Sequence, residues 1–171
     1  VSSMTARSSS QPFAAAAFGI SLCVYFFAVY KLNVLCFLLS PIPVLMSLAY
    51  PYLKRMSWLS HFLLGAILGL APAGGWVAGR AAVSWECFFL WLAVLCWVAG
   101  FDMIYALQDV AFDRAQGLHS FPAAFGGKSS LRAVKILHLI TVLAMAALGL
   151  RMNLGVFYWT GLLAALFFLA R

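Results

Sequence analysis

The sequence predicts an all-α fold, a polytopic bundle of helices that crosses a membrane several times. Of its 171 residues, 65% are hydrophobic and only 9% are charged, whereas a soluble domain usually carries roughly a quarter charged residues. The mean hydropathy is +1.02. The hydrophobic residues also form stretches about as long as a helix that crosses ~30 Å of hydrocarbon. A chain with so little polar surface requires the lipid bilayer as its solvent.

About six transmembrane helices are expected. Charged or polar residues separate the apolar stretches, and backbone polar groups in lipid must be hydrogen-bonded within their own segment, which favours helices. In chain order, the predicted spans are 13–30, 34–52, 58–77, 83–107, 133–150 and 154–170.

The third predicted span carries two signals of its own. Gly65 and Gly69 are four residues apart and allow a neighbouring helix to approach closely. The segment 71–75, which contains Pro72, is expected to kink or break the span near its outer end.

The basic residues indicate the orientation of the chain. The net charge is +7, but the charges lie singly or in pairs between apolar stretches, which argues against nucleic acid as a partner. Because successive loops alternate sides, Lys31, Arg80 and Arg151 fall on one side, and the larger group defines the cytoplasmic side. The larger group comprises Arg7, Lys54, Arg55, Arg114, Lys128, Arg132, Lys135 and Arg171.

The acidic residues are few, and most of them cluster. Apart from Glu86, they are Asp102, Asp109 and Asp113, which fall within twelve residues at the cytoplasmic end of the fourth predicted span. On one continuous helix, offsets of 7 and 11 residues would place the three carboxylates within about 40° of one another. A stripe of carboxylates beside hydrocarbon is costly unless a cation neutralises it.

Three interpretations of the stripe remain open at this point. Arg114 or Lys54 could neutralise it in a salt-bridged loop that binds nothing. Mg²⁺ could bridge the carboxylates to a phosphorylated lipid, because this cation prefers carboxylate oxygens and keeps ligand phosphates in its remaining positions. The acids could also form a proton or ion pathway.

The residues around the stripe resemble the UbiA-type intramembrane prenyltransferases. YALQDVAFD at 105–113, followed by GLHSFP at 117–122, is similar to the second Asp-rich motif of that family. YPYLKR at 50–55 resembles the YxxxK segment, and 64–76 looks like the family's next span. The sequence of these motifs most resembles the 4-hydroxybenzoate polyprenyltransferase-like branch of the family, including its relatives in menaquinone synthesis.

The resemblance implies roles for individual residues. Asp109 and Asp113 are implied to hold Mg²⁺ on a prenyl diphosphate, and Lys54 is implied to contact the diphosphate, so these three are the predicted catalytic residues.

Further substrate contacts are expected from Tyr50, Arg55, Asp102 and Arg114. For the two arginines, an ordinary ion pair or a lipid headgroup contact stays open as well. His119 could contact the diphosphate or act as a solvated or capping histidine.

The implied activity is Mg²⁺-dependent transfer of a polyprenyl group to an aromatic acceptor such as 4-hydroxybenzoate, in ubiquinone or menaquinone biosynthesis. The implied partners are a polyprenyl diphosphate, the acceptor and the lipid bilayer. The expected location is a bacterial inner membrane, with the site on the cytoplasmic side. The alternatives are a transporter fragment with an Asp relay and an inactive membrane scaffold.

Two further histidines, His61 and His138, are expected near helix ends, and no chemical role is assigned to them.

The sequence departs from the family at one important place. The family has nine spans and a first Asp-rich motif of NDxxDxxxD type, and no such motif occurs in this sequence. We therefore expect residues 1–171 to be a single transmembrane domain that is incomplete at its N-terminus and at its C-terminus, with one metal half-site.

Overall fold

The computed structural model describes the backbone of residues 2–169 and the side chains of residues 12–169, so Arg171 and the side chain of Arg7 lie outside it. The described backbone is helical with no strand, which confirms the predicted all-α class. Its helices are α1 (Ser2–Leu32), α2 (Val34–Leu39), α3 (Pro41–Met56), α4 (Ser60–Arg80), α5 (Trp85–Ala106), α6 (Val110–Ala115), α7 (Phe121–Phe125), α8 (Gly127–Arg151) and α9 (Val156–Leu169).

The chain divides into two compact units, Val1–Pro41 and Ile42–Arg171. The first unit contains α1 and α2, which meet at Asn33. The Asn33 side chain accepts a hydrogen bond from the backbone N–H of Cys36 at 2.8 Å, and this bond caps the first turn of α2. The second predicted span is thus two helices, because α2 ends before Pro41 and proline readily occupies the first position of a new helix.

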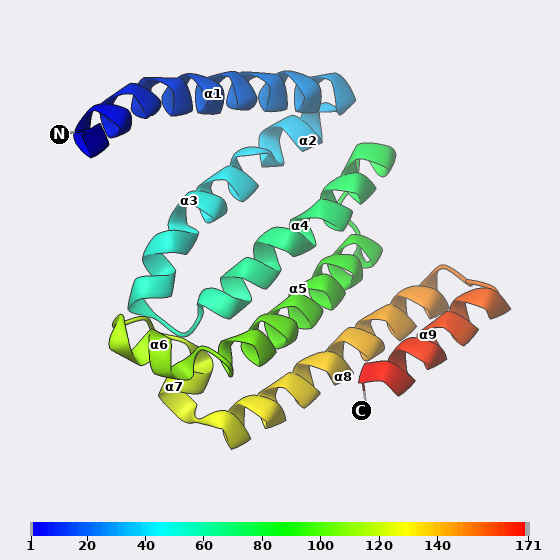
Figure 1. The fold of residues 1–171 in the computed structure, drawn as a ribbon. Helices are drawn as coiled ribbons and strands as arrows, with labels where there is room; N and C mark the ends of the chain where they lie inside the picture. Colours follow the sequence, from blue (N-terminus) through cyan, green and yellow to red (C-terminus); the bar gives the residue numbers. More distant parts are fainter. Residues whose placement is uncertain (1, 170–171) are drawn as a thin grey trace. The chain divides into compact units, whose positions relative to one another are not determined.

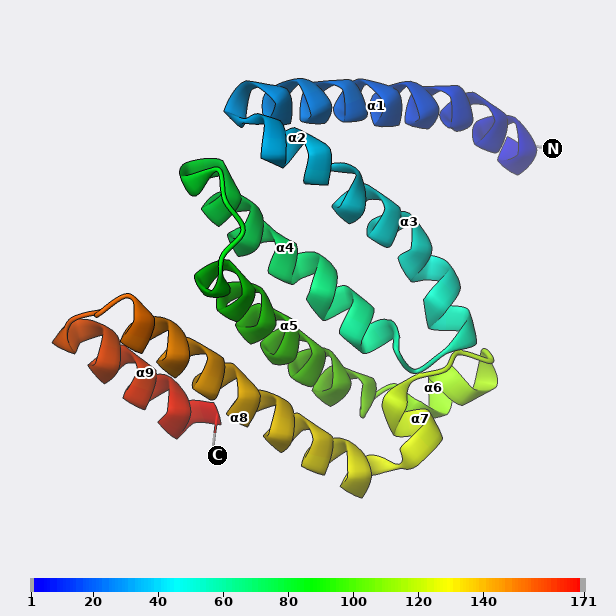
Figure 2. The same cartoon turned by 180° about the vertical axis from the view of Figure 1, so that it is seen from behind.

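In the second unit, α5 lies between α4 and α8, and α9 packs against α8 (Figures 1 and 2). The buried residues at the centre come from α5 and α8, and Ala99 and Met103 are fully buried there. The short helices α6 and α7 connect the end of α5 to the beginning of α8 (Figure 1). These connections place the C-terminus of α5 and the N-terminus of α8 at the same end of the bundle.

Gly65 and Gly69 of α4 make the close helix contact that the sequence predicts. A Cβ on Gly65 would collide with the backbone carbonyl oxygen of Leu95, and one on Gly69 would lie 2.7 Å from the carbonyl oxygen of Trp91. The α4 and α5 backbones therefore touch at these positions. Of the predicted kink or break at 71–75, the break is wrong, because α4 continues through Pro72 to Arg80.

Replacing Gly65 with Ala is expected to destabilise the bundle by about 1–3 kcal/mol, the usual range for overpacking a well-packed contact. The obstacle is backbone, which cannot rotate away as a side chain can. Gly74→Ala on the same helix is the matched control, because nothing lies within 4 Å of the position that its Cβ would take. Thermal unfolding in detergent should show a lower midpoint for Gly65→Ala alone. Equal midpoints would contradict the close packing.

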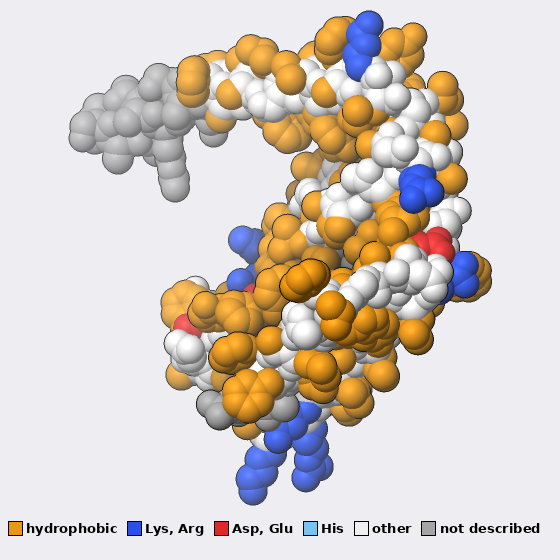
Figure 3. All heavy atoms as spheres, turned by 90° about the vertical axis from the view of Figure 1, so that its right-hand side faces the viewer, with side chains coloured by type: hydrophobic (Ala, Val, Ile, Leu, Met, Phe, Trp, Pro, Cys, Tyr) orange, Lys and Arg blue, Asp and Glu red, His pale blue; other side chains and the backbone are white. Residues whose placement is uncertain are grey.

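Within residues 2–169, five helical segments are long and apolar enough to cross a membrane: Pro12–Leu32, Val34–Met56, Ser60–Arg80, Trp85–Ala106 and Gly127–Arg151. The sixth predicted span corresponds to α9, which is apolar but only 14 residues long as described. Hydrophobic side chains cover most of the face shown in Figure 3. Such a surface suits lipid, not water.

The second unit also separates its charges as predicted. Lys54 and Arg55 end α3, Arg114 lies on α6, and Lys128 lies in the first turn of α8, all at the end of the unit where α5 finishes. Arg80 is the last residue of α4 and Arg151 is the last residue of α8, so both lie at the other end of the unit.

Candidate functional site

The end of the bundle that carries α6 and α7 is held against the end of α3 by His119. The backbone N–H of His119 donates to the carbonyl oxygen of Lys54 at 3.4 Å. Its ring Nδ1 donates to the carbonyl oxygen of Arg55 at 2.9 Å. The structure therefore brings the YxxxK segment and the loop after the Asp-rich motif together. It also gives His119 a tethering role, in line with the capping alternative.

The three aspartates do not share one continuous helix, so the predicted stripe of three carboxylates is wrong. Helix α5 ends at Ala106. The next residues form turns in which the Gln108 N–H donates to Tyr105 and the Asp109 N–H donates to Ala106, three residues back instead of four. These three-residue turns rotate the chain by more per residue than an α-helix does, so the 100° spacing assumed for the stripe does not hold across them. A new helix, α6, then begins.

Asp109 and Asp113 nevertheless stay together. The N–H of Asp113 donates to the carbonyl oxygen of Asp109 at 2.8 Å, so they are one helical turn apart and share a face. Asp109 is exposed, whereas Asp113 is buried, with 6% of its surface accessible. No ion-pair partner for Asp113 occurs among the described residues.

Gly117, which follows the Asp-rich motif, is needed for the way helix α6 ends. Helix α6 ends in a Schellman arrangement: the Leu118 N–H donates to Asp113 at 2.8 Å, and the Gly117 N–H donates to Arg114 at 3.3 Å. This ending requires a left-handed residue, and Gly117 has φ of +65°. Gly117 thus turns the chain back so that His119 reaches α3.

The pair Asp109 and Asp113 fits a divalent cation of the kind the resemblance implies. Asp113 is 6% exposed and has no ion-pair partner among the described residues, so its carboxylate is not already committed to a basic side chain. Mg²⁺ is usually bound by only one or two carboxylates, with water and substrate phosphates completing its shell. Within the described chain, no group of three or more His, Cys, Asp or Glu side chains is placed to hold a metal. Two carboxylates alone would leave most positions of such an ion to substrate phosphate, water or further protein ligands.

The predicted basic residues lie at this end but differ in their contacts. Lys54 and Arg55 are exposed. Arg114 donates from Nη2 to the carbonyl oxygen of Ala123 at 3.1 Å, which braces α6 against α7 and replaces the ion pair considered from the sequence. Tyr50 is half-buried one turn before Lys54, near enough to Asp102 to interact with it electrostatically.

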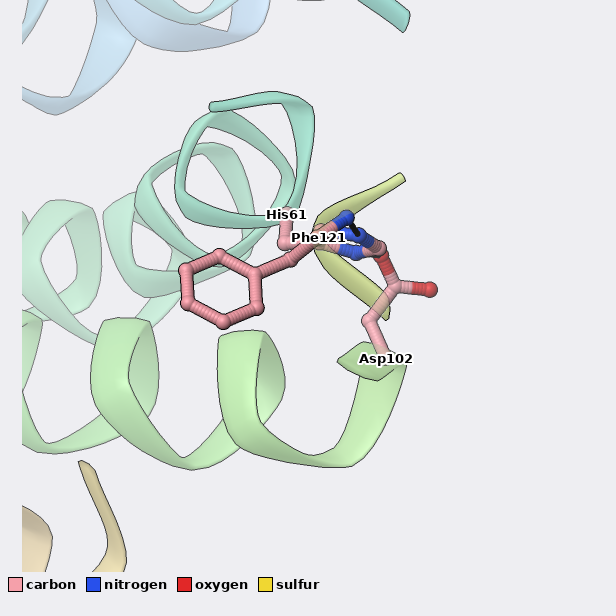
Figure 4. Close-up of polar contacts among 3 residues, drawn as sticks. All are labelled: His61, Asp102 and Phe121. Atoms are coloured by element: carbon pink, nitrogen blue, oxygen red, sulfur yellow. Dashed lines mark hydrogen bonds and ion pairs between the residues drawn. The ribbon is translucent and has the colours of Figure 1, made fainter. Parts of the chain in front are cut away.

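The feature that sequence reasoning missed is His61, which links three elements (Figure 4). Its Nδ1 lies 2.6 Å from Oδ2 of Asp102 at the end of α5. Its Nε2 accepts a hydrogen bond from the backbone N–H of Phe121 at 3.1 Å. Since Nε2 is an acceptor, the proton lies on Nδ1, which donates to the carboxylate. His61 does lie near a helix end, as predicted, but His138 is in the middle of α8.

Aromatic rings pack beside this link. The Trp58 ring lies edge-on to those of Phe62, Phe121 and Phe125, with centroids 5.3 to 6.1 Å apart. These contacts hold α7 against the turn between α3 and α4, which keeps the His61 acceptor nitrogen at the Phe121 N–H.

A polar cavity of about 450 Å³ lies at the other end of the second unit, away from the aspartates. Its lining includes Glu86 and Arg151, joined by a 2.7 Å contact from Nε to Oε1, and Arg80, which stacks on Trp76. One acid beside two arginines makes a charge cluster at this end of the unit.

The fold and this site define a polytopic helical membrane protein with an acidic and basic cluster at one end. The UbiA prenyltransferase family matches residues 4–171. The chain therefore belongs to the UbiA prenyltransferase family, which confirms the resemblance.

Several individual proteins are similar to the chain. The 4-hydroxybenzoate octaprenyltransferase of Yersinia pseudotuberculosis serotype O:1b (strain IP 31758) is 34% identical over 152 residues, covering 88% of this chain and 52% of that protein. The enzyme of the same name from Serratia proteamaculans (strain 568) is 33% identical, with 89% and 52% covered. The chain thus spans about half the length of the curated relatives it matches.

A solved structure matches as well. The apo structure of a UbiA homologue from Aeropyrum pernix K1 has a TM-score of 0.80 and 33% sequence identity, covering 93% of this chain and 62% of that one. The arrangement of helices is therefore that of a UbiA membrane protein.

Proposed function

We propose that this chain forms the second-motif half of the active site of a membrane prenyltransferase that transfers a polyprenyl group from a prenyl diphosphate to an aromatic acceptor. The acceptor we propose is 4-hydroxybenzoate or a similar ring, in ubiquinone or menaquinone biosynthesis. Both curated relatives described above are named 4-hydroxybenzoate octaprenyltransferase. We further propose that the active enzyme is a longer protein that supplies the first Asp-rich motif.

The observation that carries this proposal is the position of Asp113, which is buried, has no ion-pair partner among the described residues and lies one turn from Asp109, with the Lys54 backbone tethered to the same loop. Asp109 and Asp113 would hold Mg²⁺. When bound, this ion supplies positive charge to the diphosphate of the substrate. The distribution of basic residues favours a cytoplasmic location for this end of the bundle.

The protein groups act on a leaving group that gains charge. The allylic C–O bond breaks and the diphosphate leaves with the bonding pair, so Lys54 stabilises the transition state by matching the growing negative charge. The allylic cation is captured by the electron-rich ring, a C–C bond forms, and the ring loses a proton. Water would quench the cation, so the assembled enzyme has to exclude it from the site during transfer.

The test is transfer itself, measured with full-length enzyme in detergent or nanodiscs. Labelled prenyl diphosphate and 4-hydroxybenzoate are expected to give prenylated product with Mg²⁺, none with excess EDTA, and product again when Mg²⁺ is restored. Transfer that is unaffected by chelation would overturn the metal assignment. Ion flux into liposomes that depends on Asp109, without any transfer, would establish the relay alternative instead, and neither activity would support an inactive scaffold.

A further inference from the structure

The bonds to His61 fix how Asp102 is presented. His61 is 4% exposed, and each of its ring nitrogens has one hydrogen-bond partner, Asp102 at Nδ1 and the Phe121 N–H at Nε2. The ring is therefore held as the neutral tautomer with the proton on Nδ1. It cannot take up a second proton at Nε2 without losing the bond to Phe121.

His61 contacts only one of the two carboxylate oxygens of Asp102. Oδ2 accepts the hydrogen bond from His61, while the other oxygen points away from both His61 and Phe121 (Figure 4). The side chain is 32% exposed, so this second oxygen can be reached. Asp102 lies seven residues before Asp109, one to two turns further towards the membrane interior.

We propose that His61 is a positioning residue that acts through Asp102. It holds the carboxylate so that its second oxygen accepts a hydrogen bond from a hydroxyl group in the site, carried either by the aromatic acceptor or by a water bound to Mg²⁺. This inference rests on the proposed function. It adds a residue to which neither the family motifs nor the comparisons assign a role.

The geometry favours positioning over a proton relay or simple packing. A relay through the imidazole would need a free Nε2, and that atom is occupied by a backbone N–H. A residue that only filled space would not need two polar contacts in opposite directions. Glutamine offers the same pair of functions, an N–H₂ donor and a carbonyl acceptor in one plane, but carries no titrating group.

The experiment compares His61→Gln with His61→Leu in the full-length enzyme. His61→Leu is expected to lower kcat by about 10- to 100-fold, the usual loss when a supporting hydrogen-bond partner is removed. His61→Gln is expected to stay within about threefold of the unmodified enzyme, because both hydrogen bonds can be kept. The matched control is His138→Leu, another buried histidine, whose Nε2 has no partner among the described residues; it should leave kcat unchanged.

The Michaelis constants separate the two sources of the hydroxyl. If the acceptor supplies it, His61→Leu and Asp102→Asn raise the KM for acceptor. If a metal-bound water supplies it, the two variants raise the Mg²⁺ concentration needed for half-maximal rate. An unchanged kcat in folded His61→Leu would overturn the proposal, and so would an equal loss in His61→Gln and His61→Leu.

A measurement independent of activity keeps this inference separate from the proposed function. The chain has 3 histidines, so ¹⁵N-histidine NMR spectra of wild type and His61→Gln assign the His61 ring. A protonated Nδ1 and an unprotonated Nε2 are expected, and Asp102→Asn should shift the Nδ1 signal. The opposite tautomer would refute the positioning geometry even in an active enzyme. If the expected tautomer is seen but no transfer occurs, the proposed function fails while the geometry stands.

Discussion

Asp113→Asn in the full-length enzyme is expected to reduce prenyl transfer by at least about a hundredfold, the scale on which removing one group that stabilises transition-state charge acts. Asparagine keeps the shape of the side chain but removes the negative charge proposed to hold Mg²⁺. Initial rates at saturating Mg²⁺ and diphosphate measure the loss. Glu86→Gln, an acid at the opposite end of the second unit, is the control and should retain full rate.

The same substitution should leave stability intact. Asp113 has no ion-pair partner in the described chain, and asparagine has nearly the same shape, so the change breaks no salt bridge and opens no cavity. We therefore expect the unfolding midpoint of Asp113→Asn in EDTA to be no lower than that of the unmodified protein. A lower midpoint together with lost activity would indicate a structural role, and unchanged Mg²⁺-dependent transfer would refute the metal assignment.

Lys54→Met is expected to lower kcat by about a hundredfold, because the side chain would no longer offset the charge that grows on the departing diphosphate. Lys54 is exposed at the end of α3, and its backbone is held at the Asp-motif loop by His119. Lys54→Arg keeps the charge but changes its shape, so an intermediate rate is expected.

Lys128→Met provides the matched control for this loss. Lys128 is also exposed, and it lies at the same end of the unit, in the first turn of α8. If the two methionine variants lost activity equally, the effect would come from general surface charge, and the role of Lys54 in the reaction would have to be abandoned. Rates at two salt concentrations test this, since salt screens general surface charge more strongly than direct contacts.

Composition and hydropathy were enough to predict the membrane class and most of the helices, because burial in lipid leaves a strong apolar signal over 20 residues. The role of Gly65 and Gly69 was also predicted correctly, because glycines four residues apart on a helix leave room for a neighbouring helix backbone. The shared location of Lys54 and the Asp motif followed from counting loops.

Other features left no such signal. The turns at 107–109 depend on a change from four-residue to three-residue hydrogen bonds, which apolar periodicity does not reveal, so the three-carboxylate stripe was wrong. His61 was missed because its partners lie 41 and 60 residues away. A single histidine in an apolar helix has no local pattern that reports such contacts.

The long sequence separation of those contacts has a consequence for biogenesis. His61 enters the membrane region well before Phe121 has been made, and at about 5–20 residues per second the 60 residues between them take roughly 3 to 12 s to synthesise. During that interval the imidazole must find water or another partner at the surface of the bilayer. Its burial then marks the moment when this end of the protein is assembled. A chain that stops before Phe121 leaves Nε2 of His61 without its backbone donor and α4 without its contact to α7.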